Sequence, residues 1–217
     1  MKKILSIAIA AALAAPAFAA DTVSWTNWTS MNAGTLTQNS STIAVSYTGD
    51  AFDVDHSTYF YDVPSSFTSA EVTNAPGAGG SIRTNGGTAT VNHFHFSQAV
   101  VNPYMAIFSA GQAGNQVSFN FSGVSAGQLT LLSGGPGHWG GQALTQSGTT
   151  ILGEEGNGTL KLTGSFTDIY FTTPQAEGYY GFTLGAAVTA VPEPGSWAML
   201  AGGLGLLGLM ARRRKQG

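Results

Sequence analysis

Glu154 and Glu155 are the only adjacent acidic residues in this 217-residue chain, and paired carboxylates suggest glycoside hydrolysis. Such enzymes need two carboxyl groups that face one another across a substrate, about 5–10 Å apart. Neighbours on a strand point to opposite faces, and this pair stands beside a Gly-Asn-Gly turn signal. The sequence therefore predicts a solvated loop here and no enzyme, and a secreted polysaccharide hydrolase ranks third among the functions considered.

His93 and His95 lie two residues apart, so on a strand they share one face, as two ligands of a metal ion would. Zinc would need one or two more ligands, and the positions of His56 and His138 do not follow from the sequence. The alternating phenylalanines facing the core, with both histidines at the surface, explain the same pattern without an ion. We therefore expect no bound metal and no other cofactor.

Asp50, Asp53 and Asp55, with Asp62 nearby, form the densest acidic cluster of the chain. Calcium prefers such oxygen ligands, and extracellular modules often bind it weakly. The spacing does not match an EF-hand, and its glycine-centred loop is missing. A weak calcium site and an acidic turn without an ion remain the two interpretations.

Trp25, Trp28 and the pair His138-Trp139, the last within a glycine-rich stretch, are candidates for stacking against sugar rings. Tryptophan is also a common core residue where glycine neighbours let the backbone approach it closely. We take Trp139, His138 and Trp25 as the candidate carbohydrate-binding residues.

Composition excludes several other classes of protein. The absence of cysteine excludes a disulfide framework, a thiolate zinc site and a cysteine nucleophile. No serine nucleophile elbow and no phosphate-binding loop can be identified. Between residues 20 and 190, ten acidic residues stand against two basic ones, a net charge of −8, which repels nucleic acid.

The elements that must position these residues are strands. Ile43, Val45 and Tyr47 alternate with small polar or short residues, residues 117–122 alternate in the same way, and glycine- and asparagine-rich turn signals recur between such runs. No long segment has apolar residues at helical spacing. We predict one all-β domain over residues 20–190, an antiparallel β-sandwich or jelly roll, with residues 75–80 in a long loop.

The first 19 residues have the order of a secretory signal peptide: a positive start, a short apolar run and small residues before the cut. Ala17 and Ala19 occupy the positions of an Ala-x-Ala cleavage site, and we expect cleavage after Ala19. The chain should therefore pass through the Sec export machinery.

Residues 191–217 combine a short motif, an apolar stretch and a basic end. Pro192, Glu193 and Pro194 precede the uncharged residues 196–211, and the basic cluster then follows, made of Arg212, Arg213, Arg214 and Lys215. As a helix, the uncharged stretch would span about 24 Å, short of the ~30 Å hydrocarbon core by an amount that tilt or thinning can cover. The basic cluster should stay in the cytoplasm, which leaves the domain outside and predicts transient membrane insertion.

These three parts in this order resemble the sorting signal of PEP-CTERM proteins. The resemblance implies that Pro192, Glu193 and Pro194 are recognised by exosortase, a membrane-embedded cysteine transpeptidase, and that the residues after the motif are removed. Residues 100–109, 133–140 and 153–159 also resemble segments of other PEP-CTERM proteins, more loosely, whose domains generally have no assigned activity.

The expected function is that of a structural or interaction protein of the cell surface or extracellular matrix, associated with exopolysaccharide or biofilm. A carbohydrate-binding, lectin-like module is the alternative. Its expected partners are an exosortase-like enzyme, the Sec machinery and extracellular polysaccharide, and nucleic acid is not among them. We expect it in the envelope or outside the cell, after a membrane-anchored intermediate.

Overall fold

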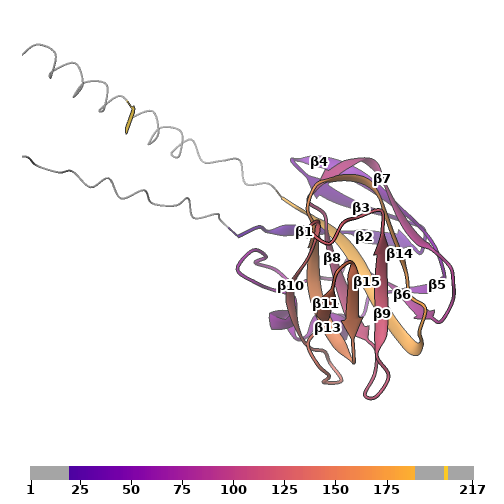
Figure 1. Cartoon of the computed structure of the whole chain (residues 1–217). Helices are drawn as coiled ribbons and strands as arrows, with labels where there is room; N and C mark the ends of the chain where they lie inside the picture. Colours follow the sequence, from indigo (N-terminus) through magenta and orange to yellow (C-terminus); the bar gives the residue numbers. More distant parts are fainter. Residues whose placement is uncertain (1–19, 189–202, 205–217) are drawn as a thin grey trace, which may run out of the picture.

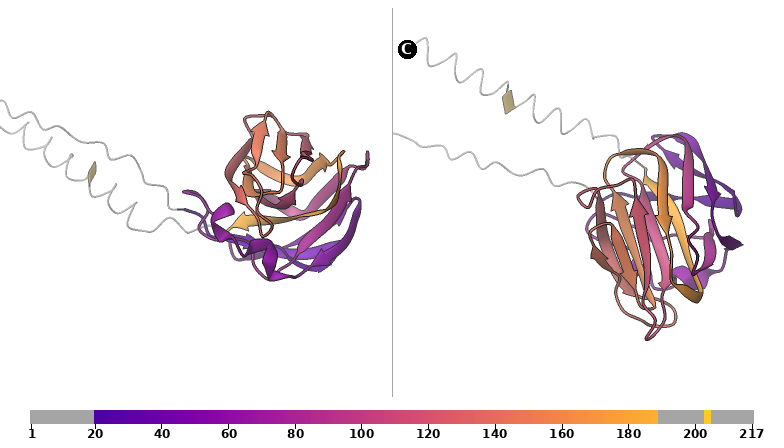
Figure 2. Two further views of the ribbon diagram at one scale, coloured as in Figure 1. Left: turned by 90° about the horizontal axis from the view of Figure 1, so that it is seen from below. Right: turned by 45° about the vertical axis from the view of Figure 1, so that its right-hand side comes forward.

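Strands make up nearly all of the regular structure. The computed structural model describes residues 20–188 and 203–204. Within them two antiparallel sheets pack face to face without closing into a barrel (Figures 1 and 2). The all-β, sandwich-like architecture expected from the alternating sequence pattern is therefore confirmed.

One sheet has seven strands and carries most of the candidate site. They are β1 (Val23–Trp25), β5 (Ala51–Asp55), β6 (Ser81–Gly86), β8 (Tyr104–Ala110), β10 (Leu129–Pro136), β13 (Gly156–Leu162) and β15 (Ala176–Ala187). The order is β10-β13-β8-β15-β6-β5, with β1 also paired to β15.

The other sheet has eight strands. They are β2 (Asn27–Ser30), β3 (Ala33–Gln38), β4 (Ser41–Thr48), β7 (Asn92–Val101), β9 (Val117–Ser122), β11 (Thr145–Ser147), β12 (Thr150–Gly153) and β14 (Ser165–Thr172). Their order is β11-β12-β9-β14-β7-β4-β3-β2. From β6 onward the chain passes to the opposite sheet after every strand except β11, so the two layers are tied together along most of the chain.

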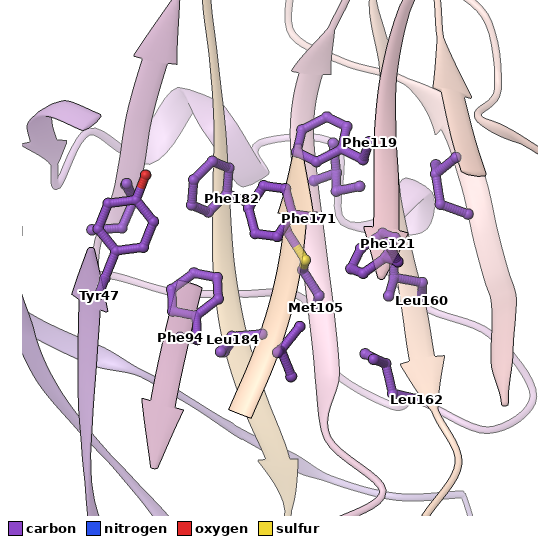
Figure 3. Close-up of a cluster of buried hydrophobic side chains, with 14 of the residues drawn as sticks. Tyr47, Phe94, Met105, Phe119, Phe121, Leu160, Leu162, Phe171, Phe182 and Leu184 are labelled. Carbon is purple, nitrogen blue, oxygen red and sulfur yellow. The ribbon is translucent and has the colours of Figure 1, made fainter. Parts of the chain in front are cut away.

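An aromatic cluster fills the space between the sheets (Figure 3). Phe182 of the seven-stranded sheet presents its ring nearly perpendicular to those of Phe94, Phe119 and Phe171 from the opposite sheet, with centroids 5.1–6.1 Å apart. Edge-to-face pairs of this kind add to the gain from burying the rings. The alternation seen in the sequence is realised here, because Ile43, Val45 and Tyr47 all point into this core.

A second layer covers the outer face of β8. The long connection between β5 and β6, residues 56–80, contains two short 3-10 helices, η1 (Thr58–Tyr61) and η2 (Pro64–Ser66). Phe67 from this connection packs on Ala106 and Phe108 of β8. All seven residues of β8 are therefore buried, and the connection packs on its own sheet as a long loop.

The described domain begins and ends at one place. Val23 of β1 pairs with Ala187 of β15, and the Val188 N–H donates to the Thr22 carbonyl. Residues 20 and 188 therefore lie at the same end of the seven-stranded sheet, where β1 meets the end of β15 in Figure 1.

Candidate functional site

Three strands of the seven-stranded sheet meet at the end of the sheet away from residues 20 and 188. Pro136 of β10 pairs with Gly156 of β13, which in turn pairs with Ala110 of β8. The three segments singled out in the sequence, residues 100–109, 133–140 and 153–159, are thus brought side by side. Glu177, near the start of β15, joins them from the strand next to β8.

Ser109 and Glu155 both have left-handed backbones at this junction, with φ of 48° and 62°. Residues other than glycine pay about 1–2 kcal/mol for this conformation, and such strain clusters at functional sites. The Ser109 Oγ donates to Glu155 Oε1 at 2.5 Å, and the Ser109 N–H donates to Asn157 Oδ1 at 2.7 Å. These bonds hold the Glu155 carboxylate against β8.

A hollow of about 180 Å³ opens beside this contact, lined by Ser109, Gln112, Trp139, Glu155, Glu177 and Gly178. Burial raises the pKa of Glu177 to about 8, and the nearby charge of Glu155 raises it too, against a lowering by the Gly111 backbone hydrogen bond. The Oε2 atom of Glu177 is buried and has no hydrogen-bond partner among the described residues. At neutral pH Glu177 is therefore mainly a neutral carboxylic acid that can donate a hydrogen bond into the hollow.

Trp139 forms one wall of this hollow and of a neighbouring hollow of about 290 Å³. Its side chain is 50% exposed, and its ring stands edge-on to Tyr59, with centroids 5.4 Å apart. His138 also contacts the indole edge-on at 5.2 Å, and its Nδ1 lies 2.5 Å from an oxygen of Asp62. The indole is therefore supported on one side while half of its surface stays accessible.

Gly141 allows the Trp139 loop to approach Glu155. It has a φ of +92°, and a Cβ at this position would overlap the Glu155 backbone carbonyl. Only glycine can adopt this positive φ without strain and also fit here without displacing the Glu155 backbone. The glycine-rich sequence around Trp139 is thus what brings the aromatic ring to the carboxylates.

The arrangement suits a neutral, hydroxyl-rich ligand. An aromatic face offers apolar contact, while a protonated carboxyl, a second carboxylate, an amide and a hydroxyl offer both donors and acceptors. The two carboxyl groups that line this hollow are Glu155, from the turn between β12 and β13, and Glu177, from β15. Glu154 lies outside this hollow but lines the neighbouring one, and it accepts the Gly114 N–H at 2.7 Å.

Glu154 and Glu155 do lie in a loop, the turn between β12 and β13, as expected, but this loop is only partly solvated. Both side chains are partly buried and hydrogen-bonded. Glu177 was missed in the sequence, because an isolated glutamate in a strand carries no local signal of the pairing that strand order creates.

Trp25 does not join Trp139, and its expected role in a sugar platform is corrected. It packs against the buried groups beneath residues 56–80, and its Nε1 donates to the Asn74 carbonyl at 3.3 Å. Trp28 is a core residue, 1% exposed, whose Nε1 donates to the Thr183 Oγ1 at 3.0 Å. Of the tryptophans in residues 20–188, Trp139 is the one placed at the hollow.

The three aspartates of the candidate calcium site all have partners within the domain, and two of them share one. Asp53 and Asp55 both lie beside Arg83, at 3.6 and 3.2 Å, while Asp50 accepts from the hydroxyls of Thr84 and Thr88. Hydrogen bonds from Ser57 and Tyr59, and the charge of Arg83, outweigh burial and lower the pKa of Asp55. Within residues 20–188 these three do not converge as a ligand set, because a guanidinium already occupies the position of a cation.

His93 and His95 stand on the outer face of the eight-stranded sheet, with Phe94 and Phe96 buried behind them, as the alternation predicted. Asp168 of β14 lies between the two imidazoles, and its carboxylate could complete a ligand set. The sequence did not reveal this aspartate, which is more than 70 residues away.

The sorting residues lie outside the described part of the chain. This holds for the signal peptide with Ala17 and Ala19, for Pro192, Glu193 and Pro194, and for the basic cluster with its preceding apolar stretch. Among residues 20–188 and 203–204, no helix is long and apolar enough to cross a membrane.

Comparison with known protein families identifies this region. A family model described as the PEP-CTERM protein-sorting motif matches residues 190–215, which include the Pro-Glu-Pro motif and the basic cluster. The chain therefore carries a PEP-CTERM sorting motif near its C-terminus, and this motif implies an extracellular protein that is sorted by exosortase to the cell envelope or surface. Searches of curated proteins and of solved structures gave no match.

Proposed function

We propose that this chain is a non-catalytic structural or interaction protein of the extracellular polysaccharide matrix. The observation that carries the proposal is a sorting motif attached to a rigid, acidic β-sandwich. A net charge of −8 keeps such a domain soluble and separate from other polyanions. The Sec machinery delivers it, a membrane-anchored intermediate presents the motif, and exosortase removes the tail.

The geometry of β15 supports this role. Glu177 and Ala187 are ten residues apart on one strand, about 33 Å at ~3.3 Å per residue. The sorting motif follows the end of β15, whereas the hollow lies near its beginning. A domain held by its tail would therefore present the hollow away from the membrane.

Intact mass spectrometry of the protein from native cells tests the processing. We expect the mature form to lack residues 1–19 and the basic cluster. Replacing Glu193 with alanine, or removing exosortase, should leave Arg212, Arg213, Arg214 and Lys215 on the protein, while Glu71→Ala in the domain should not. An unchanged mass that includes the basic cluster in wild-type cells would contradict the processing step.

A second candidate function, carbohydrate binding, rests on a specific observation: the half-exposed Trp139 beside Glu155 and Glu177. Stacking of a sugar ring on the indole and hydrogen bonds to the carboxyl groups would together bind a neutral sugar unit. The raised pKa of Glu177 supports a neutral ligand, because a neutral acid can donate to a sugar hydroxyl.

Co-sedimentation or calorimetry with polysaccharide purified from the native matrix tests this function. We expect Trp139→Ala to weaken binding at least about 10-fold, since the stacking contact is lost. Phe52→Ala is the matched control, because Phe52 is 46% exposed but lies on β5, away from the hollow. Equal binding by both variants and the wild type would rule out the hollow as the sugar site.

The same samples distinguish binding from catalysis. We expect no release of reducing ends from the polysaccharide. Steady release that Glu177→Gln abolishes would instead assign a hydrolase with Glu155 and Glu177 as its two carboxyl groups.

A further inference from the structure

The outer face of the eight-stranded sheet holds a second cluster of titratable groups, separate from the hollow. β7 and β14 are antiparallel neighbours, and their register places Asp168 opposite His95 and Tyr170 opposite His93. A register shift between Phe166 and Asp168 produces this alignment. All four side chains therefore share one face, since the alternate residues of both strands point into the core.

The three ligand-type side chains converge on one point. His93 Nε2 lies 2.7 Å and His95 Nδ1 2.9 Å from the same atom, Asp168 Oδ1. The three candidate ligand atoms all lie within 4.8 Å of one another. Ligands of a tetrahedral zinc ion are about 3.3 Å apart, given metal–ligand bonds of about 2.0–2.2 Å. The two contacts to Asp168 would lengthen by about half an ångström to admit the ion, and the two nitrogens, within 4.8 Å of each other, would adjust to the same spacing.

The donor set is that of a first-row transition metal. Two imidazole nitrogens and one carboxylate oxygen suit zinc and its neighbours, whereas calcium and magnesium prefer oxygen alone. Side-chain exposures of 28% for His93, 53% for His95 and 32% for Asp168 leave room for water in the remaining coordination positions. The ring of Tyr170 stacks on His93 at 4.4 Å and 14°, which restricts the orientation of that ligand.

The charge of Asp168 is available to an ion. An aspartate side chain is ordinarily a carboxylate at neutral pH, and this one is 32% exposed. Residues 20–188 contain only two lysine or arginine residues, and both pair elsewhere: Arg83 with Asp53 and Asp55, and Lys161 with Glu71. In this part of the chain no lysine or arginine ion pair competes for Asp168.

We propose that His93, His95 and Asp168 form a surface site for one divalent transition metal ion of the zinc type, completed by water. The site is independent of the sugar-binding hollow, since it uses other strands and the other sheet. It would let an exported protein without cysteine hold a metal ion through nitrogen and oxygen ligands alone.

Calorimetric titration of the purified exported protein with ZnCl₂ at pH 7.5, after treatment with a chelator, tests the proposal. We expect one zinc ion per chain. His95→Ala and Asp168→Asn should each weaken binding at least about 10-fold, because each removes or neutralises a ligand.

His138→Ala is the matched control. His138 also pairs with an aspartate, Asp62, but no second histidine shares that carboxylate in residues 20–188. This variant should bind zinc like the wild type, and zinc should raise the melting temperature of both but not that of Asp168→Asn. If Asp168→Asn does not fold, the half-exposed His95→Ala supplies the same comparison.

Three results would overturn the proposal. They are the absence of stoichiometric zinc binding by the wild type, undiminished binding by His95→Ala, or equal loss in His138→Ala. Tighter binding of CaCl₂ than of ZnCl₂ would also contradict the proposed donor chemistry.

Discussion

At the scale of single residues, Glu177 is the group whose environment departs furthest from that of an ordinary surface carboxylate. Its raised pKa comes from burial and from the charge of Glu155, which shares the hollow. A folded domain that keeps such a group protonated binds a proton that the unfolded chain releases. Because ionising Glu177 costs free energy only in the folded domain, the stability of the domain should depend measurably on pH.

We predict that the free energy of unfolding falls as pH rises from about 4.5 to about 8, the ordinary and the folded pKa of Glu177. The sign follows because the folded state holds more protons than the unfolded state in this window. Glu177→Gln should reduce this fall in the free energy of unfolding by roughly 1–3 kcal/mol. This is less than the full pKa shift implies, because the hollow is open to solvent and solvent screens the charge.

Urea unfolding at pH 5 and pH 8.5 measures the difference. Glu154→Gln is the control, because Glu154 lies next to Glu155 in sequence but outside the hollow that contains Glu177. If Glu177→Gln keeps the full pH dependence of stability, that dependence does not come from Glu177.

At the scale of elements, the loop after β10 decides whether an aromatic ring and two carboxyl groups form one site. Its close approach to the β12–β13 turn depends on glycine at position 141, where both the backbone angle and the space exclude a side chain. The adjacent Gly140 has a similar φ of +89° but open space around it. Comparing an alanine substitution at each of the two glycines therefore separates the free-energy cost of backbone strain from the cost of displacing the loop.

We expect Gly140→Ala to destabilise the domain by about 1 kcal/mol, from backbone strain alone. Gly141→Ala should cost at least about 2 kcal/mol, because the loop must also move away from Glu155. Urea unfolding gives both values, and tryptophan fluorescence reports the altered surroundings of Trp139. Equal destabilisation by the two variants would show that the loop is not held against Glu155.

Strand register likewise determines which residues meet at the proposed metal site. The irregularity in the pairing of β14 with β7 decides which residue faces His95. A regular continuation from Phe166 opposite Val100 would place Asp168 opposite Gln98 instead. The proposed ligand set is therefore a property of the paired strands and of neither strand alone.

At the scale of the whole described domain, two sheets pack around one aromatic core, and residues 20 and 188 lie at the same end of it. Phe182 contacts four rings of the opposite sheet and is fully buried. It is the single residue whose loss should most weaken the attachment of one layer to the other. Residue 188, after which the tail follows in sequence, and the hollow proposed to bind sugar lie toward opposite ends of β15.

We predict that Phe182→Ala lowers the free energy of unfolding by about 3–5 kcal/mol, the usual effect of removing a buried phenylalanine. Phe52→Ala should cost less than about 1 kcal/mol, since that ring is partly exposed and stacks mainly under Arg83. Chemical unfolding of the two variants is the measurement. Similar losses would contradict the central role of Phe182 in joining the sheets.

Much of this molecule was predictable from local patterns in the sequence. Alternation at Ile43, Val45 and Tyr47, and at His93 to Phe96, correctly indicated strands and their buried faces, because the side-chain period of a strand is a local property. The Pro-Glu-Pro motif with its apolar and basic continuation likewise depends only on consecutive residues, and the family comparison confirms that motif.

Only the tertiary structure decided which distant residues meet. Glu177 reaches Glu155, and Asp168 reaches His95, through strand order and register that depend on the packing of both sheets. The same packing separated Trp25 from Trp139 and placed Arg83 among the aspartates of the expected calcium cluster. The physical reason is that side-chain period is encoded within a strand, whereas pairing between strands is chosen by the free energy of the whole core.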